Sequence, residues 1–124
     1  MTAAFAPRRV AKPWGEELIW ALTDRYCGKI ITIETGRRLS LQYHEAKDEA
    51  IHVTAGRLLL LLEDDEGRDV LTELGPGDSA HVPAGRRHRY EAIERVQLVE
   101  VSTPELDDVV RIEDDFGREG TNAP

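Results

Sequence analysis

Cysteine is almost absent from this sequence, since Cys27 is the only one among 124 residues. A single thiol cannot form an internal disulfide framework and is typical of a reducing compartment. We therefore expect a cytoplasmic protein in which Cys27 is a small buried apolar residue.

Long hydrophobic runs are also missing. The apolar stretch at 58–62 is far too short to cross a bilayer. Residues 1–10 lack the continuous apolar core of a signal peptide. These absences predict that the protein has no membrane partner.

Basic residues are scarce relative to acidic ones, with 16 Lys and Arg against 24 Asp and Glu and a net charge of −8. Nucleic acids and anionic membranes both require a basic face, so neither is expected as a partner. A length of 124 residues suits one domain. With 40% apolar and 32% charged residues, we expect a packed core rather than general disorder.

No long helical stripe interrupts the chain, whereas Gly- and Pro-containing turn signals recur at short intervals. Between them lie eight strand-length segments rich in Ile, Val, Leu and Thr. These segments are 28–35, 38–44, 49–55, 57–63, 69–74, 79–82, 88–93 and 96–102. This pattern predicts an all-β sandwich or barrel.

The two ends differ from this central part, which covers about 28–103 of a single domain spanning 1–124. Residues 1–12 are expected to form an arm that pairs with an edge strand or with a partner subunit. Residues 104–115 are rich in acidic side chains and are expected to form one helical turn or a short strand. Residues 117–124 are expected to be a frayed tail.

Four residues have the spacing of a metal site. Gln42 and His44 alternate onto one face of a strand, so they project side by side. A short turn then brings Glu49 across from His44, and His88 opens another strand after the sharp turn at 83–85. Two imidazoles, a carboxylate and an amide oxygen suit one divalent ion, namely Zn, Mn, Fe, Co or Ni.

These residues also carry a resemblance to a known family. The first cupin motif is matched by Gly36, Gln42, His44, Glu49 and Gly56, with Gln42 in place of its first histidine. The second is matched by Gly77, Pro83, Gly85 and His88. The resemblance implies a double-stranded β-helix, a small jelly-roll barrel, with one metal ion inside, for which zinc is favoured.

A narrower likeness extends over most of the chain. The segments 12–15, 40–44 and 110–118 resemble the C-terminal domain of type II mannose-6-phosphate isomerases. In those enzymes the domain is usually fused to a nucleotidyltransferase, and Gln is typical at the first ligand position. The likeness implies a sugar or sugar-phosphate isomerase or epimerase, and cupins of this kind are commonly homodimers, so we expect a homodimer.

The sequence departs from that group around the ligand Glu49. The group usually has Arg two residues before this glutamate and His-Trp directly after it, where this chain has Lys47, Ala50 and Ile51. Ala92 replaces the Asn that often closes the second motif. A lysine keeps the positive charge but loses the planar two-pronged grip of arginine on a phosphate. We therefore expect weak or absent turnover of mannose 6-phosphate itself.

An aldose–ketose isomerase also needs a general base, and Glu100 is the best candidate. It is an acid inside the apolar segment 96–101, where burial would raise its pKa. His81 is a second candidate for this role. Lys47 joins Glu100 in the expected catalytic pair.

Further side chains are candidates for contact with a small-molecule substrate. Arg111, Arg86, Lys12 and Lys47 are available for an anionic group, with Arg111 favoured because it lies in the matched C-terminal segment. Tyr43 is expected to contact the substrate beside the ligands. Trp14 and Trp20 could stack on a sugar, although core or interface packing is the more common use of tryptophan.

Two other classes of function remain open at this point. A redox metal in the same site would make the protein a small-molecule oxygenase, and the site without turnover would make it a sugar- or metabolite-binding module. The amide ligand Gln42 weakens the oxygenase reading, because many oxygenase sites use more imidazole. No helix-turn-helix segment accompanies the barrel, which disfavours a DNA-binding regulator.

Overall fold

The structure is a computed structural model that describes residues 4–124, and these residues form nine strands joined by turns. The strands are β1 (Arg8–Lys12), β2 (Gly15–Leu22), β3 (Cys27–Ile33), β4 (Leu41–Tyr43), β5 (Glu49–Glu63), β6 (Asp69–Leu74), β7 (Ser79–Val82), β8 (His88–Ser102) and β9 (Val110–Glu113). The expected all-β class is confirmed. Residues 4–124 contain no helix with the length and apolar character that crossing a bilayer would require.

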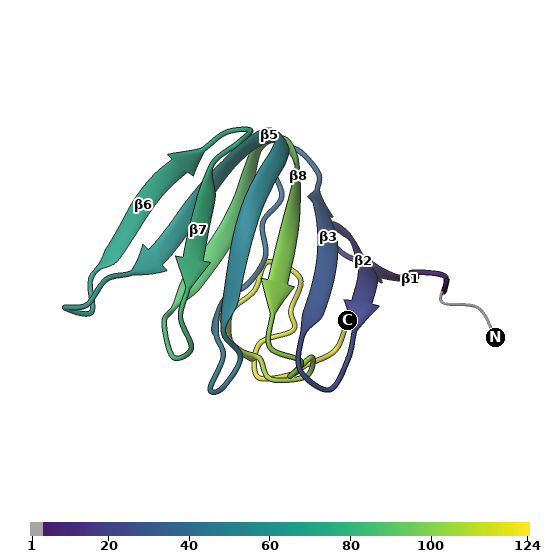
Figure 1. Cartoon of the computed structure of the whole chain (residues 1–124). Helices are drawn as coiled ribbons and strands as arrows, with labels where there is room; N and C mark the ends of the chain where they lie inside the picture. The colour runs from purple at the N-terminus through teal and green to yellow at the C-terminus, as the bar shows by residue number, and fades with distance from the viewer. Residues whose placement is uncertain (1–3) are drawn as a thin grey trace.

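The two long strands β5 and β8 organise the barrel (Figure 1). They pair antiparallel along most of their length, and β5 pairs with β7 near its start and with β6 near its end. The last part of β8 pairs with β3, whereas His88 at its start pairs with β4. The first half of β5 and the last half of β8 therefore lie in the layer β1-β2-β3-β8-β5-β7. The last half of β5 and the first half of β8 lie in the layer β6-β5-β8-β4-β9.

The bend between the layers falls at Gly56. The β5–β8 register shifts between Val53 and Leu58, and Gly56 has a φ of 81°. A Cβ at this position would lie 1.9 Å from the carbonyl oxygen of Arg95. The predicted segments 49–55 and 57–63 are therefore one bent strand, β5, and the segments 88–93 and 96–102 are one bent strand, β8. A bulge changes the direction of a strand without ending its pairing.

The interior changes character along the strands. The inward side chains of β3 and β8 pair as Ile33 with Val96, Ile31 with Leu98 and then Lys29 with Glu100. All six residues are buried. One end of the barrel is therefore an apolar core, and the other end is lined by buried charges.

The N-terminal arm pairs with the sheet, and the C-terminal tail is more ordered than expected. Residues 8–12 of the arm form the edge strand β1 and pair with β2, and its residues 1–3 lie outside the described residues. β2 was not among the predicted strands, because its bulge after Ile19 breaks the period-two pattern. The predicted frayed tail instead folds back: Arg118 pairs with Asp114 at 2.7 Å, and Thr121 O accepts a hydrogen bond from Arg111 Nη1 at 3.1 Å.

Candidate metal centre and its cavity

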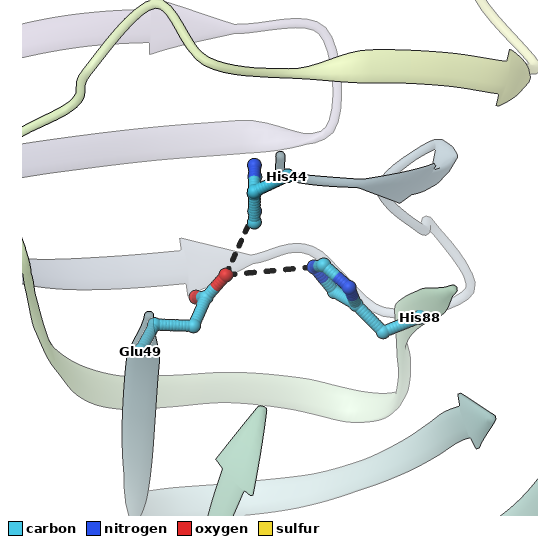
Figure 2. A group of neighbouring side chains, drawn as sticks. All are labelled: His44, Glu49 and His88. Atoms are coloured by element: carbon cyan, nitrogen blue, oxygen red, sulfur yellow. Dashed lines mark ion pairs between the residues drawn. The ribbon is translucent and has the colours of Figure 1, made fainter. Parts of the chain in front are cut away.

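Three of the four predicted ligands converge at the polar end of the barrel (Figure 2). One ligand atom from each of His44, Glu49 and His88 lies within 4.8 Å of the others, and all three residues are buried. Glu49 Oε1 is 2.8 Å from His44 Nε2 and 3.5 Å from His88 Nε2. The turn at Gly85 contacts the start of the loop between β4 and β5, since the Gly85 N–H donates to His44 O at 2.7 Å.

Backbone carbonyls fix the tautomer of both imidazoles. A carbonyl oxygen only accepts, so His44 Nδ1 donates to Asp108 O at 2.5 Å and His88 Nδ1 donates to Arg86 O at 2.9 Å. In the neutral rings both Nε2 atoms then carry bare lone pairs. These two atoms and Glu49 Oε1 are buried without a hydrogen-bond partner. Three electron pairs aimed at one another repel unless a cation lies between them, so the donor set fits a divalent metal ion.

Gln42 lies beside this cluster. It is directly opposite His88 in the β4–β8 pairing, so both side chains are on one face. Gln42 Oε1 accepts a hydrogen bond from Ser40 Oγ at 2.5 Å. An amide oxygen has two lone pairs, so this bond leaves one free for a metal. Its role as fourth ligand stays a prediction.

The carboxyl group of Glu49 is held in its charged form. Burial by itself would raise its pKa, but a hydrogen bond from Glu100 and the charge of Lys47 hold that pKa well below the usual range. Tyr90 Oη also donates to Glu49 Oε2 at 3.2 Å. Glu49 is thus an anionic side chain beside the two imidazoles, which suits it to bind a metal ion.

A cavity next to the metal ligands is rich in positive charge. Its lining includes Gln42 and His44 together with five basic side chains and one acid. The basic residues are Lys12, Lys29, Lys47, Arg111 and Arg118, and the acid is Glu17. In a chain with a net charge of −8, this lining is a local concentration of positive charge, which favours an anion.

Some of these cations are already paired. Lys29 Nζ is 3.2 Å from Glu17 Oε1, and Arg118 pairs with Asp114 at 2.7 Å. Even so, Arg111 Nε and Arg118 Nη1 are buried without a hydrogen-bond partner. A buried guanidinium donor left unpaired is costly, so these two N–H groups call for an acceptor in the cavity.

Lys47 and Glu100 form a buried ion pair at 3.3 Å. Burial, followed by the charge of Glu49, raises the pKa of Glu100 to about 8. Burial would lower the pKa of Lys47, but the charges of Glu100 and Glu49 outweigh it and raise that pKa. Lys47 lines the cavity, and Glu100 contacts its ammonium group.

Three sequence-predicted candidates are not brought to the cavity. Arg86 donates to Glu63 O at 3.1 Å on the β6 side of the barrel. Tyr43 is half-buried and follows Gln42 in β4, so alternation turns it to the opposite face. His81 lies on the outer face of β7, where it pairs with Asp48 at 2.7 Å.

Other residues at the site were missed. Lys29 alternates with Ile31 and Ile33 on the buried face of β3, so strand periodicity alone could have placed this lysine inside. Arg118 lies in the matched C-terminal segment but was not predicted to bind anything. Nothing in the local sequence signals the role of Asp108.

Asp108, in the segment before β9, holds the loop at 44–48 that carries His44. Its carboxylate accepts hydrogen bonds from the N–H groups of Glu45, Ala46 and Lys47 at 3.0, 2.8 and 2.9 Å. Its carbonyl oxygen orients His44. These four bonds hold a ligand-bearing loop that has no regular structure of its own.

Asp108→Ala should therefore weaken metal binding by about 10–100-fold, the usual effect of losing an outer-shell partner. Titration with Co²⁺, followed by its visible absorption, measures both the affinity and the ligand geometry. Glu105→Ala, an exposed acid of the same segment, is the matched control. An unchanged affinity and spectrum in Asp108→Ala would contradict this role.

Comparisons with known proteins agree with this architecture. A family model described as a cupin domain matches residues 29–102. The chain is 35% identical over 116 residues to a mannose-1-phosphate guanylyltransferase of Escherichia coli, covering 90% of this chain and 23% of that protein. It is 34% identical over 116 residues to the xanthan biosynthesis protein XanB of Xanthomonas campestris, covering 90% and 24%. The chain thus spans about a quarter of the length of these relatives.

Solved structures show the same fold at low sequence identity. KdgF from Halomonas sp. superposes with a TM-score of 0.69 at 21% identity, covering 81% of this chain and 88% of that one. Oxalate decarboxylase from Bacillus subtilis gives a TM-score of 0.75 at 16% identity, covering 86% and 30%.

Proposed function

The chain belongs to the cupin domain family, and from this membership we propose that it is a metal-dependent isomerase or epimerase acting on an anionic sugar, a sugar phosphate in the first instance. The observation that carries the proposal is the pair of unpartnered buried donors, Arg111 Nε and Arg118 Nη1. They line the same cavity as the ligands Gln42 and His44. A substrate with a polar, metal-binding end and an anionic end fits both halves of this cavity.

The sequence relatives support a sugar phosphate as substrate class. The proteins similar over 90% of the chain include one named for mannose 1-phosphate, which is a phosphorylated sugar. A phosphate group has several acceptor oxygens and forms short, strong bonds with guanidinium groups. Lys12, which also lines the cavity, adds a third positive charge to such a site.

His44, Glu49, His88 and Gln42 would hold the metal ion. When bound, such an ion polarises a substrate carbonyl and stabilises the negative charge that develops on its oxygen. Lys47 and Glu100 handle the proton in our proposal. Lys47 first passes a proton to the Glu100 carboxylate, and its free amine then takes the carbon-bound proton next to the carbonyl. Lys47 returns that proton to the neighbouring carbon and recovers its own from Glu100, so the product is an isomer of the substrate.

Calorimetry with the metal-loaded protein tests the substrate class. We expect hexose phosphates to bind more tightly than about 1 mM, some 4 kcal/mol, and free hexoses to bind more weakly. Arg111→Met should reduce phosphate-ester affinity by about 10–100-fold, because a hydrogen bond to a charged group contributes about 1.5–3 kcal/mol. Arg86→Met, an arginine away from the cavity, is the matched control. Equal affinity for free and phosphorylated sugars would contradict the proposal.

A coupled assay for ketose formation tests the reaction. We expect conversion of a hexose phosphate other than mannose 6-phosphate, which should react weakly because of the changes around Glu49. Binding without conversion would favour a sensing module. Metal-dependent consumption of oxygen with substrate would favour an oxygenase.

A further inference from the structure

The cavity beside the metal ligands continues outward into a second compartment, which we call the vestibule. The inner cavity includes Gln42 and His44, and the vestibule includes Arg8 and Asp107. Six side chains line both spaces and therefore form the passage between them, namely Lys12, Glu17, Lys29, Leu106, Val109 and Arg111. A ligand at the metal that is longer than the inner cavity therefore extends past this passage into the vestibule.

Strand register places Arg8 on the inner face of the sheet. Arg8 is directly opposite Ile19, and Ile19 is opposite Lys29 on the next strand. Side chains of opposed residues share one face, and Lys29 is buried inside the barrel. The next residue, Arg9, points to the other face, where it pairs with Glu16. The two adjacent arginines of β1 thus lie on opposite faces of the sheet.

The cations of the two spaces form a line rather than one cluster. Arg8 and Lys12 are four positions apart on one face of β1, which is about 13 Å along an extended strand. Side chains stand roughly perpendicular to a sheet, so these two charges stay well separated. Lys12 lies at the passage with Arg111, and Arg8 lies in the vestibule. The arrangement suits a ligand with more than one anionic group.

Three of these cations have no counter-ion of their own. Within residues 4–124, the side chains of Arg8, Lys12 and Arg111 form no ion pair, and Arg111 Nε is buried without a hydrogen-bond partner. Burial and the charges of the neighbouring cations lower the pKa of Lys12, although the charge of Glu17 opposes this shift. An anion placed between these cations relieves their mutual repulsion.

The acids of the vestibule leave an excess of positive charge. Glu17 is 3.2 Å from Lys29, so this pair is neutral. Asp107 is exposed and offsets one of the three unpaired cations at most. A metal ion at the inner end adds further positive charge.

We propose that the substrate is a sugar carrying two phosphate groups, with its inner phosphate beside Arg111 and Arg118 and its outer phosphate in the vestibule beside Arg8. This inference rests on the proposed function, because it extends the same substrate beyond the first phosphate site. Lys12 lies between the two phosphate positions. Guanidinium groups form short, strong hydrogen bonds with phosphate oxygens, so Arg8 is the specificity-determining residue for the outer group.

Calorimetry with the metal-loaded protein tests the second phosphate site. The probes are fructose 1,6-bisphosphate and fructose 6-phosphate, which differ by one phosphate group and share a carbonyl carbon that carries none. We expect the bisphosphate to bind at least about 10-fold more tightly, which corresponds to about 1.4 kcal/mol. The quantity compared between variants is the ratio of the two affinities.

Arg8→Met should bring this ratio close to one, because it removes the cation of the vestibule and keeps a side chain of similar reach. Asp107→Asn should raise the ratio by about two- to fivefold, since it removes an exposed like charge beside the outer phosphate. Arg9→Met is the matched control, because it removes an arginine from the other face of the same strand and should keep the parent ratio. Circular dichroism establishes that the variants are folded.

The outcomes separate this inference from the proposed function. Equal affinities for the two probes in the parent protein, both tighter than about 1 mM, would overturn the second phosphate site and leave the sugar-phosphate proposal standing. A ratio that stays high in Arg8→Met, or falls as much in Arg9→Met, would overturn the placement of the outer phosphate. If neither probe binds, the proposed function fails and this inference fails with it.

Discussion

Replacing His88 with alanine should remove nearly all bound metal and weaken binding of a divalent ion by more than about 100-fold, beyond the loss that follows removal of an outer-shell partner. His88 Nε2 is one of three buried atoms that converge without a hydrogen-bond partner. Its Nδ1 is already committed to Arg86 O, so the ring has no second binding mode. With His88 gone, His44, Glu49 and Gln42 cannot enclose the ion.

Elemental analysis of purified protein and a Co²⁺ titration measure this effect. The parent chain should carry about one ion, because four protein ligands and water or substrate complete a single site. His81→Ala is the matched control, since His81 is a histidine on the outer face. Full occupancy in the double variant His44→Ala with His88→Ala would contradict the ligand assignment.

Chelation of the metal should also lower the thermal midpoint of the parent chain, because an ion that binds only the folded state stabilises it by mass action. The same chelator should leave the midpoint of His88→Ala unchanged. A midpoint that falls equally in both proteins would indicate an effect on some other site.

Gly56→Ala should lower the free energy of unfolding by more than about 3 kcal/mol, among the largest effects expected of a single methyl group. The added Cβ would lie 1.9 Å from Arg95 O, which is backbone and cannot move without breaking the β5–β8 pairing. The φ of 81° at Gly56 adds the usual cost of a left-handed alanine. Since β5 and β8 span both layers, the strain falls on the whole barrel.

Gly36→Ala is the matched control. Gly36 has a φ of 77°, but a Cβ there meets no atom within 4 Å. Gly36→Ala should therefore lower the free energy of unfolding by only about 1 kcal/mol, which is the conformational cost alone. Denaturant unfolding of both variants gives the difference, and equal losses would show that the close approach to Arg95 is not limiting.

The residues proposed as metal ligands were predictable because their positions depend on local rules. Alternation along one short strand sets Gln42 and His44 on the same face, and a short turn brings Glu49 back. His88 required the resemblance or the second turn signal, because its partner His44 is far away in the chain. The same local rule would have placed Lys29 inside the barrel had it been applied to β3.

Other predictions depended on which strands pair, and the local sequence does not specify that. Arg86 is close to His88 in sequence, yet its side chain turns toward β6 because the loop at 83–87 changes direction. Residues 117–124 are polar and look like a free tail. Their order comes from Arg118 and Thr121, which contact Asp114 and Arg111.

The sequence by itself determined the all-β class, the period-two faces and the residues able to bind a metal, since these follow from neighbours a few positions apart. Only the tertiary structure decided which distant polar groups meet. Asp108 O reaches His44 across 64 positions, and Glu100 reaches Lys47 across 53. The physical reason is the pairing of strands far apart in the sequence, because β4 pairs with β9 and the start of β5 pairs with the end of β8. The loop at 44–48 between β4 and β5 therefore meets Asp108 and Glu100.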